Sequence, residues 1–572
     1  MKWDKFSAHI PIILIIILAV FFRFVYLGTI PNALGGDELH YALTAKAVFF
    51  TGRDISGSWH PLSALVFRYP PNEGQAELPY FLHLLVSAPF PFSLFMFKLP
   101  FALLGTGTVL LLYAIANLLF GPAVGIAVGL VAAMNPWLVV MDRTGYEAAP
   151  AAFFYMLALY VVLKARSWKI LWAIIPLLFA FYSYIATKVI FVPFVLAASL
   201  LAFFKQKRQF AKQYVILCGI SVAIVVIFFL LFKTNPNVTR LNDIFLPNSS
   251  MVADQVNEIR KTAIQSTFLP LVVNKYTVYL RVIASKLFRI FSPEYLFVEG
   301  DQFFLPVSQS FFYWLDAVFL FMGAVYLFAK KKIFAWIIGL FVLIGTFPHL
   351  VNTTMGDFSI HLTLMFPFLV LVIGAGVAET LQNLPKRFFI PAFLTIILLY
   401  TANVANFSVG YFGQYPLTGD ADFPMRILTK YVVLARNSDK RVIVYAAVPS
   451  DLFQKYIYYS GSITRANIPL LATRVFSQEI EFEGTQFLPC DAKKNRDGQS
   501  IIVYDRGCGV KIEEPRTAIA SLMDGGEAYK ILDDSVCSNY QLTRYPERIG
   551  VGDFAIEKLA EKHFCEKYIS IR

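Results

Sequence analysis

The stretch "SAHIPIILIIILAVFFRFVYL", residues 7–27, decides the fold class, because this apolar run is long enough to cross a lipid bilayer. It follows the charged start "MKWDK" and shows no small-residue cleavage site. We therefore interpret it as a retained membrane helix rather than a removed signal peptide. Because Lys2 and Lys5 precede the run, its N-terminal end is expected on the cytoplasmic side.

The composition of the whole chain indicates many such helices. Of its 572 residues, 57% are hydrophobic, 16% are aromatic and only 15% are charged, whereas soluble domains carry roughly 25% charged residues. The net charge of +12 could suggest a nucleic-acid partner, but many Lys and Arg residues lie in short clusters between apolar runs. That distribution is typical of the cytoplasmic loops of a polytopic membrane protein, and no nucleic-acid partner is expected.

Apolar runs of roughly bilayer length recur along the chain and predict about eleven membrane helices. The run Leu78–Phe90 is too short to span and is bracketed by prolines, so we expect a re-entrant or interfacial helix there. Residues 268–296 are apolar but contain four basic residues, which favours an amphipathic segment lying on the membrane surface. Counting both as spans would give thirteen helices. The eleven predicted spans are 7–27, 98–119, 121–140, 148–164, 169–186, 189–204, 213–232, 310–329, 333–349, 361–381 and 388–407.

Charge and cysteine placement predict the orientation in the cell membrane. An odd number of spans puts the C-terminus outside, and this register places the basic clusters 164–169, 205–212, 330–332 and 386–387 on the cytoplasmic side. Four of the five cysteines lie in the polar C-terminal part, an even set that an oxidising compartment would pair. Of the three possible connectivities we favour Cys490–Cys508 and Cys537–Cys565.

The predicted domain organisation follows from these spans. Residues 1–407 form a transmembrane domain with external loops at 28–97 and 233–309, and residues 408–572 form an extracytoplasmic domain. This tail combines β-branched runs, "RVIVYAAV" at 441–448 and "SIIVYD" at 500–505, with helix-like stretches such as Asp451–Tyr459. We therefore expect a small α/β domain.

Two adjacent carboxylates, Asp37 and Glu38, follow the first span in "GGDELHYALTAKAVFFTGRD", residues 35–54. Asp37 starts a helical pattern in which Tyr41 and Thr44 share its face. In a purely structural interpretation, Asp37 is the helix N-cap and Glu38 a favourable first-turn charge. In a functional interpretation, the rigid helix start holds a carboxylate that accepts a proton. The two interpretations are compatible.

Further charged residues are expected on the same outer side. Arg143 and Glu147, in "MDRTGYEAAP" at 141–150, are four residues apart and could simply pair. Lys188, in "YSYIATKVIFVPF" at 182–194, is either a snorkelling lysine or a cation for a lipid phosphate. Arg68 is another candidate cation, and "FSPEYLFVEGD" at 291–301 adds an acidic loop that ends at Asp301.

Motifs of soluble nucleotide-dependent enzymes are not found. The sequence has no Walker A loop, dinucleotide fingerprint, HExxH motif or nucleophile elbow, and its seven histidines show no zinc spacing. We expect no metal and no cofactor. An enzyme on the outer face would therefore need a donor other than ATP or a nucleotide sugar.

Taken together, these motifs resemble the multispanning C-type glycosyltransferases that use polyprenyl-phosphate sugars, such as protein O-mannosyltransferases and the aminoarabinose transferase of lipid A. The resemblance rests on the Asp37-Glu38 pair, on "ELPYFLHLL" at 77–85, on "DRTGYE" at 142–147, and on the two motifs that contain Lys188 and Asp301. It covers about residues 8–407. It implies an inverting transfer of a hexose or pentose to a glycan, lipid or protein acceptor at the outer membrane face.

The resemblance also implies roles for individual residues. Asp37 would be the base that deprotonates the acceptor hydroxyl, with Glu38 supporting it or binding the acceptor. A sugar phosphate leaves as an anion, so cations are expected at the donor phosphate. Lysine stands at 188 where many relatives have arginine, and "QFFLPVSQ" after Asp301 lacks the expected basic residue. The expected phosphate contacts are Lys188, Arg143 and Arg68, and the expected acceptor or sugar contacts are Tyr41, Glu147 and Asp301.

Two other function classes are alternatives to this one. A transporter or flippase of a lipid-linked saccharide usually has ionisable residues near the bilayer midplane, but here the predicted midspans are almost uncharged and the acids cluster outside. A degenerate membrane protein whose external domain binds a partner is the other alternative. The Asp37-Glu38 pair favours the enzyme over it.

Overall fold

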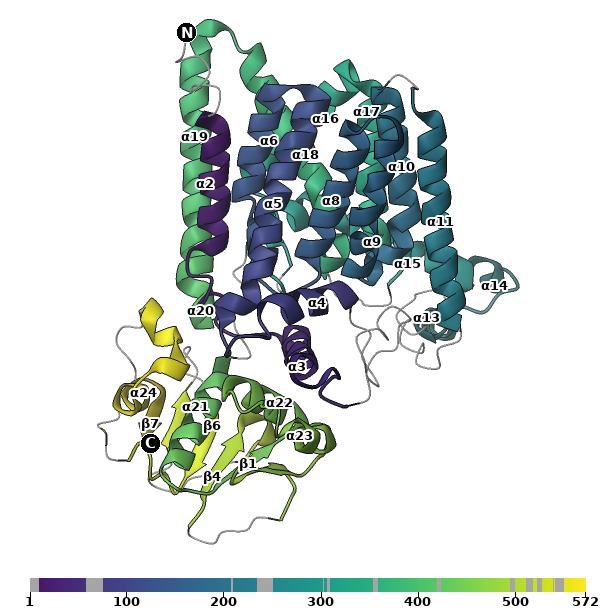
Figure 1. Ribbon diagram of the computed structural model, residues 1–572. Coiled ribbons are helices and arrows are strands. Elements are labelled where there is room, and N and C mark those ends of the chain that lie inside the picture. Colours follow the sequence, from purple (N-terminus) through teal and green to yellow (C-terminus); the bar gives the residue numbers. More distant parts are fainter. Residues whose placement is uncertain are drawn as a thin grey trace. The chain divides into compact units, whose positions relative to one another are not determined.

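A computed structural model describes most of the chain (Figure 1). The chain divides by its internal contacts into two compact units. Unit 1 comprises residues 1–25, 62–79 and 101–410, and unit 2 comprises residues 26–61, 80–100 and 411–572. The residues described are 10–57, 76–206, 209–233, 250–301, 303–305, 309–352, 358–418, 423–493, 499–510, 518–521, 527–538, 540 and 550–571.

Unit 1 is a bundle of apolar helices. The helix α18 lies at its centre and packs against α6, α16 and α17. Its approach to α16 depends on glycine, because a Cβ atom on Gly376 would lie 1.9 Å from the carbonyl oxygen of Phe319. Small residues of this kind let membrane helices pack backbone to backbone. The bundle helices are α2 (Ile10–Phe24), α5 (Leu94–Phe120), α6 (Pro122–Met134), α7 (Pro136–Met141), α8 (Ala148–Lys164), α9 (Ile174–Ser183), α10 (Phe191–Lys205), α11 (Ala211–Lys233), α16 (Trp314–Lys330), α17 (Lys332–Leu350), α18 (Met365–Asn383) and α19 (Lys386–Ser408).

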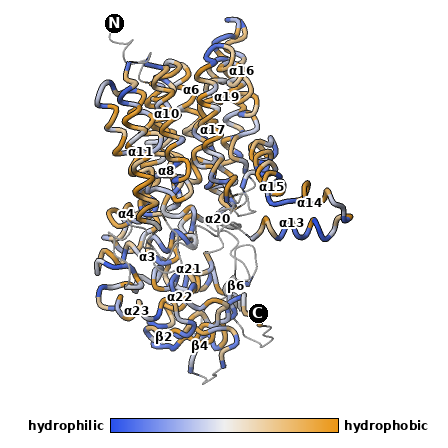
Figure 2. The backbone as a smooth tube through the Cα atoms, turned by 90° about the vertical axis from the view of Figure 1, so that its right-hand side faces the viewer, coloured by the Kyte–Doolittle hydropathy of each residue, from blue (hydrophilic) through white to orange (hydrophobic). Residues whose placement is uncertain are grey.

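Within the described residues, six helical stretches are long and apolar enough to cross a membrane, and five shorter apolar helices accompany them. Hydrophobic residues dominate the bundle throughout its length (Figure 2). The helix α8 has the bounds of the predicted span 148–164. The predicted span 121–140 is instead broken, because the Asn135 side chain accepts a hydrogen bond from the Leu138 N–H (3.0 Å) and starts the new helix α7. The predicted class, a polytopic helical membrane protein with a small C-terminal α/β domain, is confirmed by the mostly helical chain and its small C-terminal mixed sheet.

A helical hairpin extends sideways from the bundle of unit 1 (Figures 1 and 2). It consists of α13 (Ser250–Thr262), the short α14 (Leu269–Val272) and α15 (Lys275–Ile290). Val252 and Val256 on α13 pack against Val278 on α15 in a small core of their own. The hairpin contains most of the segment that the sequence predicts to be amphipathic.

Unit 2 contains a mixed sheet with the order β2-β3-β1-β4-β6-β5-β7 among the described residues. The interior strand β1 is parallel to β3 and β4, and the remaining pairs are antiparallel. β1, β4 and the helix α22 lie where the sequence predicts two strands and a helix. The elements are α21 (Phe423–Asn437), β1 (Val442–Ala446), α22 (Pro449–Tyr459), α23 (Ile468–Arg474), β2 (Ile480–Phe482), β3 (Thr485–Pro489), β4 (Ile501–Asp505), β5 (Ala518–Ser521), β6 (Glu527–Leu532), α24 (Glu561–Tyr568) and β7 (Ile569–Ile571).

The helix α3 (Gly36–Thr51), which carries the two adjacent carboxylates, belongs to unit 2 and packs against α22. Leu39 and Leu43 on α3 share one hydrophobic core with Ile457 on α22. Just before α3, the Leu34 N–H donates a hydrogen bond to the Tyr459 hydroxyl (2.8 Å). The contacts thus group residues 26–61 with the C-terminal residues, whereas the sequence analysis assigned the whole loop 28–97 to the transmembrane domain.

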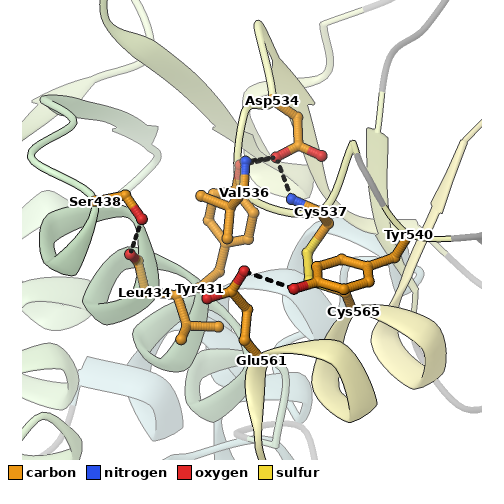
Figure 3. The surroundings of a disulfide bond; sticks show 9 residues. All are labelled: Tyr431, Leu434, Ser438, Asp534, Val536, Cys537, Tyr540, Glu561 and Cys565. Atoms are coloured by element: carbon orange, nitrogen blue, oxygen red, sulfur yellow. Dashed lines mark hydrogen bonds between the residues drawn. A yellow bond between two sulfur atoms is a disulfide. The ribbon is translucent and has the colours of Figure 1, made fainter.

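Two disulfides close the C-terminal part of unit 2, with the pairing that the sequence analysis favours. Cys537 and Cys565 are fully buried. Figure 3 shows their surroundings, where the Asp534 carboxylate accepts hydrogen bonds from the N–H groups of Val536 (2.9 Å) and Cys537 (3.1 Å). The same oxygen accepts a hydrogen bond from the hydroxyl of Tyr431 on α21 (2.6 Å). The Cys537–Cys565 disulfide and these hydrogen bonds therefore connect α24 to α21.

We expect mild reduction to open Cys490–Cys508 before Cys537–Cys565. Both cysteines of the first pair are partly exposed, whereas those of the second are buried, and exchange requires that a thiolate reach the sulfur. Differential alkylation and mass spectrometry along a dithiothreitol titration measure the order. In the loop-entropy picture, loss of Cys537–Cys565, which closes the longer loop, should destabilise unit 2 by about 3–4 kcal/mol, slightly more than loss of Cys490–Cys508. Four free thiols in the untreated protein would contradict the predicted outer location of this unit.

Candidate functional site

The two adjacent carboxylates, Asp37 and Glu38, have different structural roles at the start of α3. Gly35 is the N-cap, with extended backbone angles (φ −67°, ψ 170°). The Glu38 side chain turns back and accepts a hydrogen bond from the Gly35 N–H (2.7 Å), which satisfies one of the free donors of the helix start. The interpretation of Asp37 as the N-cap is therefore wrong, because Gly36 already has helical geometry and moves the cap back to Gly35.

Asp37 and Glu38 also differ in exposure. Glu38 is 4% exposed, whereas Asp37 is exposed in the first turn of α3. The helix that carries them packs against α22. Tyr458 of α22 is buried close to Glu38, and burial together with that carboxylate raises the pKa of the tyrosine hydroxyl. Unit 2 therefore presents the Asp37 carboxylate to solvent from a rigid, capped helix start. A carboxylate in this position can accept a proton.

Tyr41 is buried one turn further along α3. Its ring lies 6.2 Å from that of His83 in α4 (Glu77–Val86), and His83 stacks on Phe97 at 3.9 Å. These contacts join α3 to residues 80–100 within unit 2. The predicted contact of Tyr41 with an acceptor stays a prediction.

Unit 2 also contains a cavity of about 300 Å³ along α3. Lys46 of α3 lines it and donates hydrogen bonds to the carbonyl oxygens of Ala88 (2.8 Å) and Phe90 (2.6 Å). Tyr458 also lines it. Asp37 does not line this cavity, and the sequence analysis did not identify it.

Lys188 takes part in a buried ion pair in unit 1. It lies in the short helix η3 (Ala186–Ile190), and its Nζ is 3.0 and 3.1 Å from the two carboxylate oxygens of Glu77. The side chains of the pair are 7% and 2% exposed. The rings of Phe181, Tyr182 and Phe228 surround the ammonium group at 5.1–5.2 Å. Glu77 begins the motif at 77–85, but the sequence does not reveal it as the partner of Lys188, because 111 residues separate the pair.

The motif "DRTGYE" is anchored by its first two residues. Asp142 forms a buried ion pair with Arg23 near the end of α2 (2.7 Å), which the sequence analysis missed. Gly105 of α5 makes room for this carboxylate, since a Cβ atom there would lie 2.0 Å from its Cγ. Arg143 is fully buried and donates a hydrogen bond to the Phe22 carbonyl oxygen (3.0 Å). Glu147, at the N-cap of α8, is 7% exposed.

Asp301 joins two loops of unit 1. Its Oδ1 accepts a hydrogen bond from the Phe303 N–H (2.8 Å), and its Oδ2 accepts one from the Ser359 N–H (2.7 Å). Burial raises the pKa of this carboxyl, and the backbone hydrogen bonds oppose the rise. Asp301 thus has a clear structural role, and its predicted contact with sugar or acceptor stays a prediction. Arg68, the third predicted phosphate contact, lies outside the described residues.

A group of polar side chains that the sequence analysis missed lies at the ends of several helices in unit 1. His361 Nδ1 bonds the Tyr184 hydroxyl, and its Nε2 lies 3.0 Å from the Asn352 amide nitrogen. Burial, with a smaller contribution from Lys286, lowers the pKa of His361 to about 4, so the ring is neutral at pH 7. Within the described part of the chain, no three His, Cys, Asp or Glu residues are grouped as metal ligands.

Comparisons with known proteins give structural similarity only. No family model matches the chain, and no curated protein matches it. The structure is similar to that of ArnT from Cupriavidus metallidurans bound to undecaprenyl phosphate, with a TM-score of 0.49, 12% identity, and coverage of 93% of this chain and 99% of that one.

Archaeal oligosaccharyltransferases are also similar. For AglB from Archaeoglobus fulgidus in complex with an inhibitory peptide and a dolichol-phosphate, the TM-score is 0.44 at 11% identity, with coverage of 94% of this chain and 75% of that one. For the Archaeoglobus fulgidus oligosaccharyltransferase tethered with an acceptor peptide, the TM-score is 0.44 at 12% identity. That match covers 81% of this chain but only 64% of the archaeal enzyme, so the chain spans less than two thirds of its length.

Proposed function

We propose that the protein is a membrane glycosyltransferase that moves a sugar from a polyprenyl-phosphate carrier to a glycan, lipid or protein acceptor, with inversion at the anomeric carbon. The observation that carries this proposal is the exposed Asp37 carboxylate on a helix start that Glu38 caps. The sequence resemblance supports it, because Asp37 and Glu38 are the first of the shared motifs. The N-terminus is proposed to be cytoplasmic and the C-terminal domain to be outside.

Asp37 is proposed to act as the general base. As the acceptor hydroxyl attacks the anomeric carbon from the face opposite the phosphate, Asp37 takes its proton. The new glycosidic bond forms while the bond from the anomeric carbon to the phosphate oxygen breaks. The polyprenyl phosphate leaves with the bonding electrons, and Asp37 later releases its proton to water. Glu38 is proposed to hold the helix start rather than to take the proton.

The leaving phosphate is proposed to be stabilised by Lys188 and Arg143, with Arg68 as a further cation. Both described cations are almost completely buried, where charge interacts more strongly than in water. Lys188 already holds an anion, the Glu77 carboxylate. We infer that the donor phosphate takes the place of this carboxylate on the Lys188 ammonium group. Tyr41, Glu147 and Asp301 remain proposed contacts of the sugar or acceptor.

The positions of charged residues favour an enzyme over a transporter of lipid-linked saccharide. In the described helices of unit 1, Arg23 lies in the last turn of α2 and Asp316 in the first turn of α16. Lys188 likewise lies at the start of its candidate span Ala186–Lys205. Transporters instead bind their substrates near the bilayer midplane on broken helices.

The experiment that tests this function supplies the purified protein, in lipid nanodiscs, with a panel of synthetic polyprenyl-phosphate hexoses and pentoses. We expect free polyprenyl phosphate to accumulate for one sugar, as measured by mass spectrometry, and faster when a cell-envelope extract supplies acceptors. Protein with Asp37→Asn is the matched control. Movement of an intact lipid-linked sugar across proteoliposomes without phosphate release would instead identify a transporter.

A further inference from the structure

The hairpin α13–α15 exposes an apolar surface that no described part of the chain covers. Its bend, residues 263–273, is the most exposed part, and Ile264 is 94% exposed. On α15, Tyr276 and Leu280 are one turn apart on the same side of the helix and are also exposed. Apolar surface of this extent marks a contact with another molecule or with a membrane. The exposed apolar residues are Ile264, Phe268, Leu271, Val272, Tyr276, Leu280 and Phe288.

The charge of the same segment has a single sign. Residues 259–292 contain six basic residues and not one Asp or Glu, whereas Glu258 and Glu294 flank this stretch. Cations that surround exposed apolar side chains fit a surface of anionic lipid headgroups. The same charge opposes a symmetric contact with a second copy, because like charges would face one another. The six basic residues are Arg260, Lys261, Lys275, Arg281, Lys286 and Arg289.

The base of the hairpin is fixed at the end of a candidate membrane span. Lys286 is buried, and its Nζ donates hydrogen bonds to the carbonyl oxygens of Asn352 (2.6 Å) and His349 (3.4 Å). His349 lies in the last turn of α17, so this anchor is at the level where the span meets water. The start of α15 lies about 16 Å from Lys286 along the helix. The hairpin therefore leaves the bundle at the height of the headgroups and extends sideways (Figures 1 and 2).

We propose that the hairpin rests on anionic lipid, with the apolar side chains of its bend inserted among the headgroups and upper acyl chains and with its exposed basic side chains on lipid phosphates. Basic side chains lie on both sides of the apolar ones along the bend, since Lys261 precedes Phe268 and Leu271 in the sequence and Lys275 follows them. The proposal concerns the contact of the hairpin with lipid and does not depend on glycosyl transfer.

The test places a fluorescent bimane label on Leu271→Cys in the full-length protein, in a Cys218→Ser background that removes the free thiol. The protein is reconstituted in nanodiscs that contain spin-labelled lipid, with or without phosphatidylglycerol. We expect blue-shifted emission and at least threefold stronger quenching than for the matched label on Asp254→Cys, an exposed polar position of α13. Both substituted side chains are exposed, so neither substitution should disturb the fold.

A charge variant separates the two parts of the proposal. Lys275→Gln/Arg281→Gln should reduce the quenching of the Leu271 label by half or more in anionic nanodiscs and leave it unchanged in neutral ones. Water-like emission at both label positions would overturn the proposal. Protection that appears in detergent and rises with protein concentration would identify a second copy as the occupant and would also overturn it.

Discussion

Replacing Asp37 by Asn is expected to reduce sugar transfer about 10²–10⁴-fold, the usual contribution of a general base. The amide keeps the shape of the side chain but cannot take the acceptor proton. The side chain is exposed, so the fold should persist, with a loss of about 0.3–1 kcal/mol from the missing charge at the helix N-terminus. The measurement is the release of polyprenyl phosphate by the purified variant, together with its thermal unfolding.

Glu38 provides the matched comparison for Asp37. Glu38→Gln should keep most of the activity, because glutamine can also accept the hydrogen bond from the Gly35 N–H. Glu38→Ala removes the cap and should destabilise the protein by about 0.5–2 kcal/mol, as lost caps usually do. If Asp37→Asn turned over normally while Glu38→Gln lost activity, the base would be Glu38.

The second large effect is expected at Lys188. Lys188→Met leaves the Glu77 carboxylate buried without its cation, and breaking a buried pair in this way costs about 3–5 kcal/mol. The double variant Lys188→Met/Glu77→Gln removes both charges and should recover most of that stability. Thermal unfolding in nanodiscs measures both changes.

Affinity for polyprenyl phosphate without a sugar separates the binding role of Lys188 from its structural role. The double variant should bind this lipid about 10–100-fold more weakly despite its recovered stability, since a hydrogen bond to a charged group contributes about 1.5–3 kcal/mol. Glu77→Gln alone should bind it more tightly than the unchanged protein, because the competing anion is gone. Native mass spectrometry measures the affinity. If Lys188→Met, Lys188→Met/Glu77→Gln and Glu77→Gln all bound the lipid equally well, Lys188 would be a purely structural residue.

The helices of unit 1 were predictable because the bilayer fixes both their length and their composition. The span 148–164 could be located to the residue, and the runs around 441–448 and 500–505 located two strands of the sheet. The break at Asn135 was missed because an asparagine within an apolar run has little effect on mean hydropathy. Its capping hydrogen bond appears only in the structure.

The partners of the candidate residues could not be predicted in the same way. Asp142 and Arg23 are 119 residues apart, so their pairing depends on how separate helices pack. The cap of α3 differed from the expectation by a small shift of the helix start, which two glycines permit. The motifs identified which residues are chemically notable. They carried no information about which of them are already engaged by another side chain.

The packing of α3 on α22 has a consequence for the biogenesis of the protein. The ribosome makes residues 36–51 early and the helix at 449–459 some four hundred residues later. Until that helix emerges, Leu39 and Leu43 lack Ile457 and the other C-terminal members of their core. The Asp37 carboxylate is then on a segment without its final support. The proposed activity should therefore begin only after residues 449–459 have been made and have packed against α3.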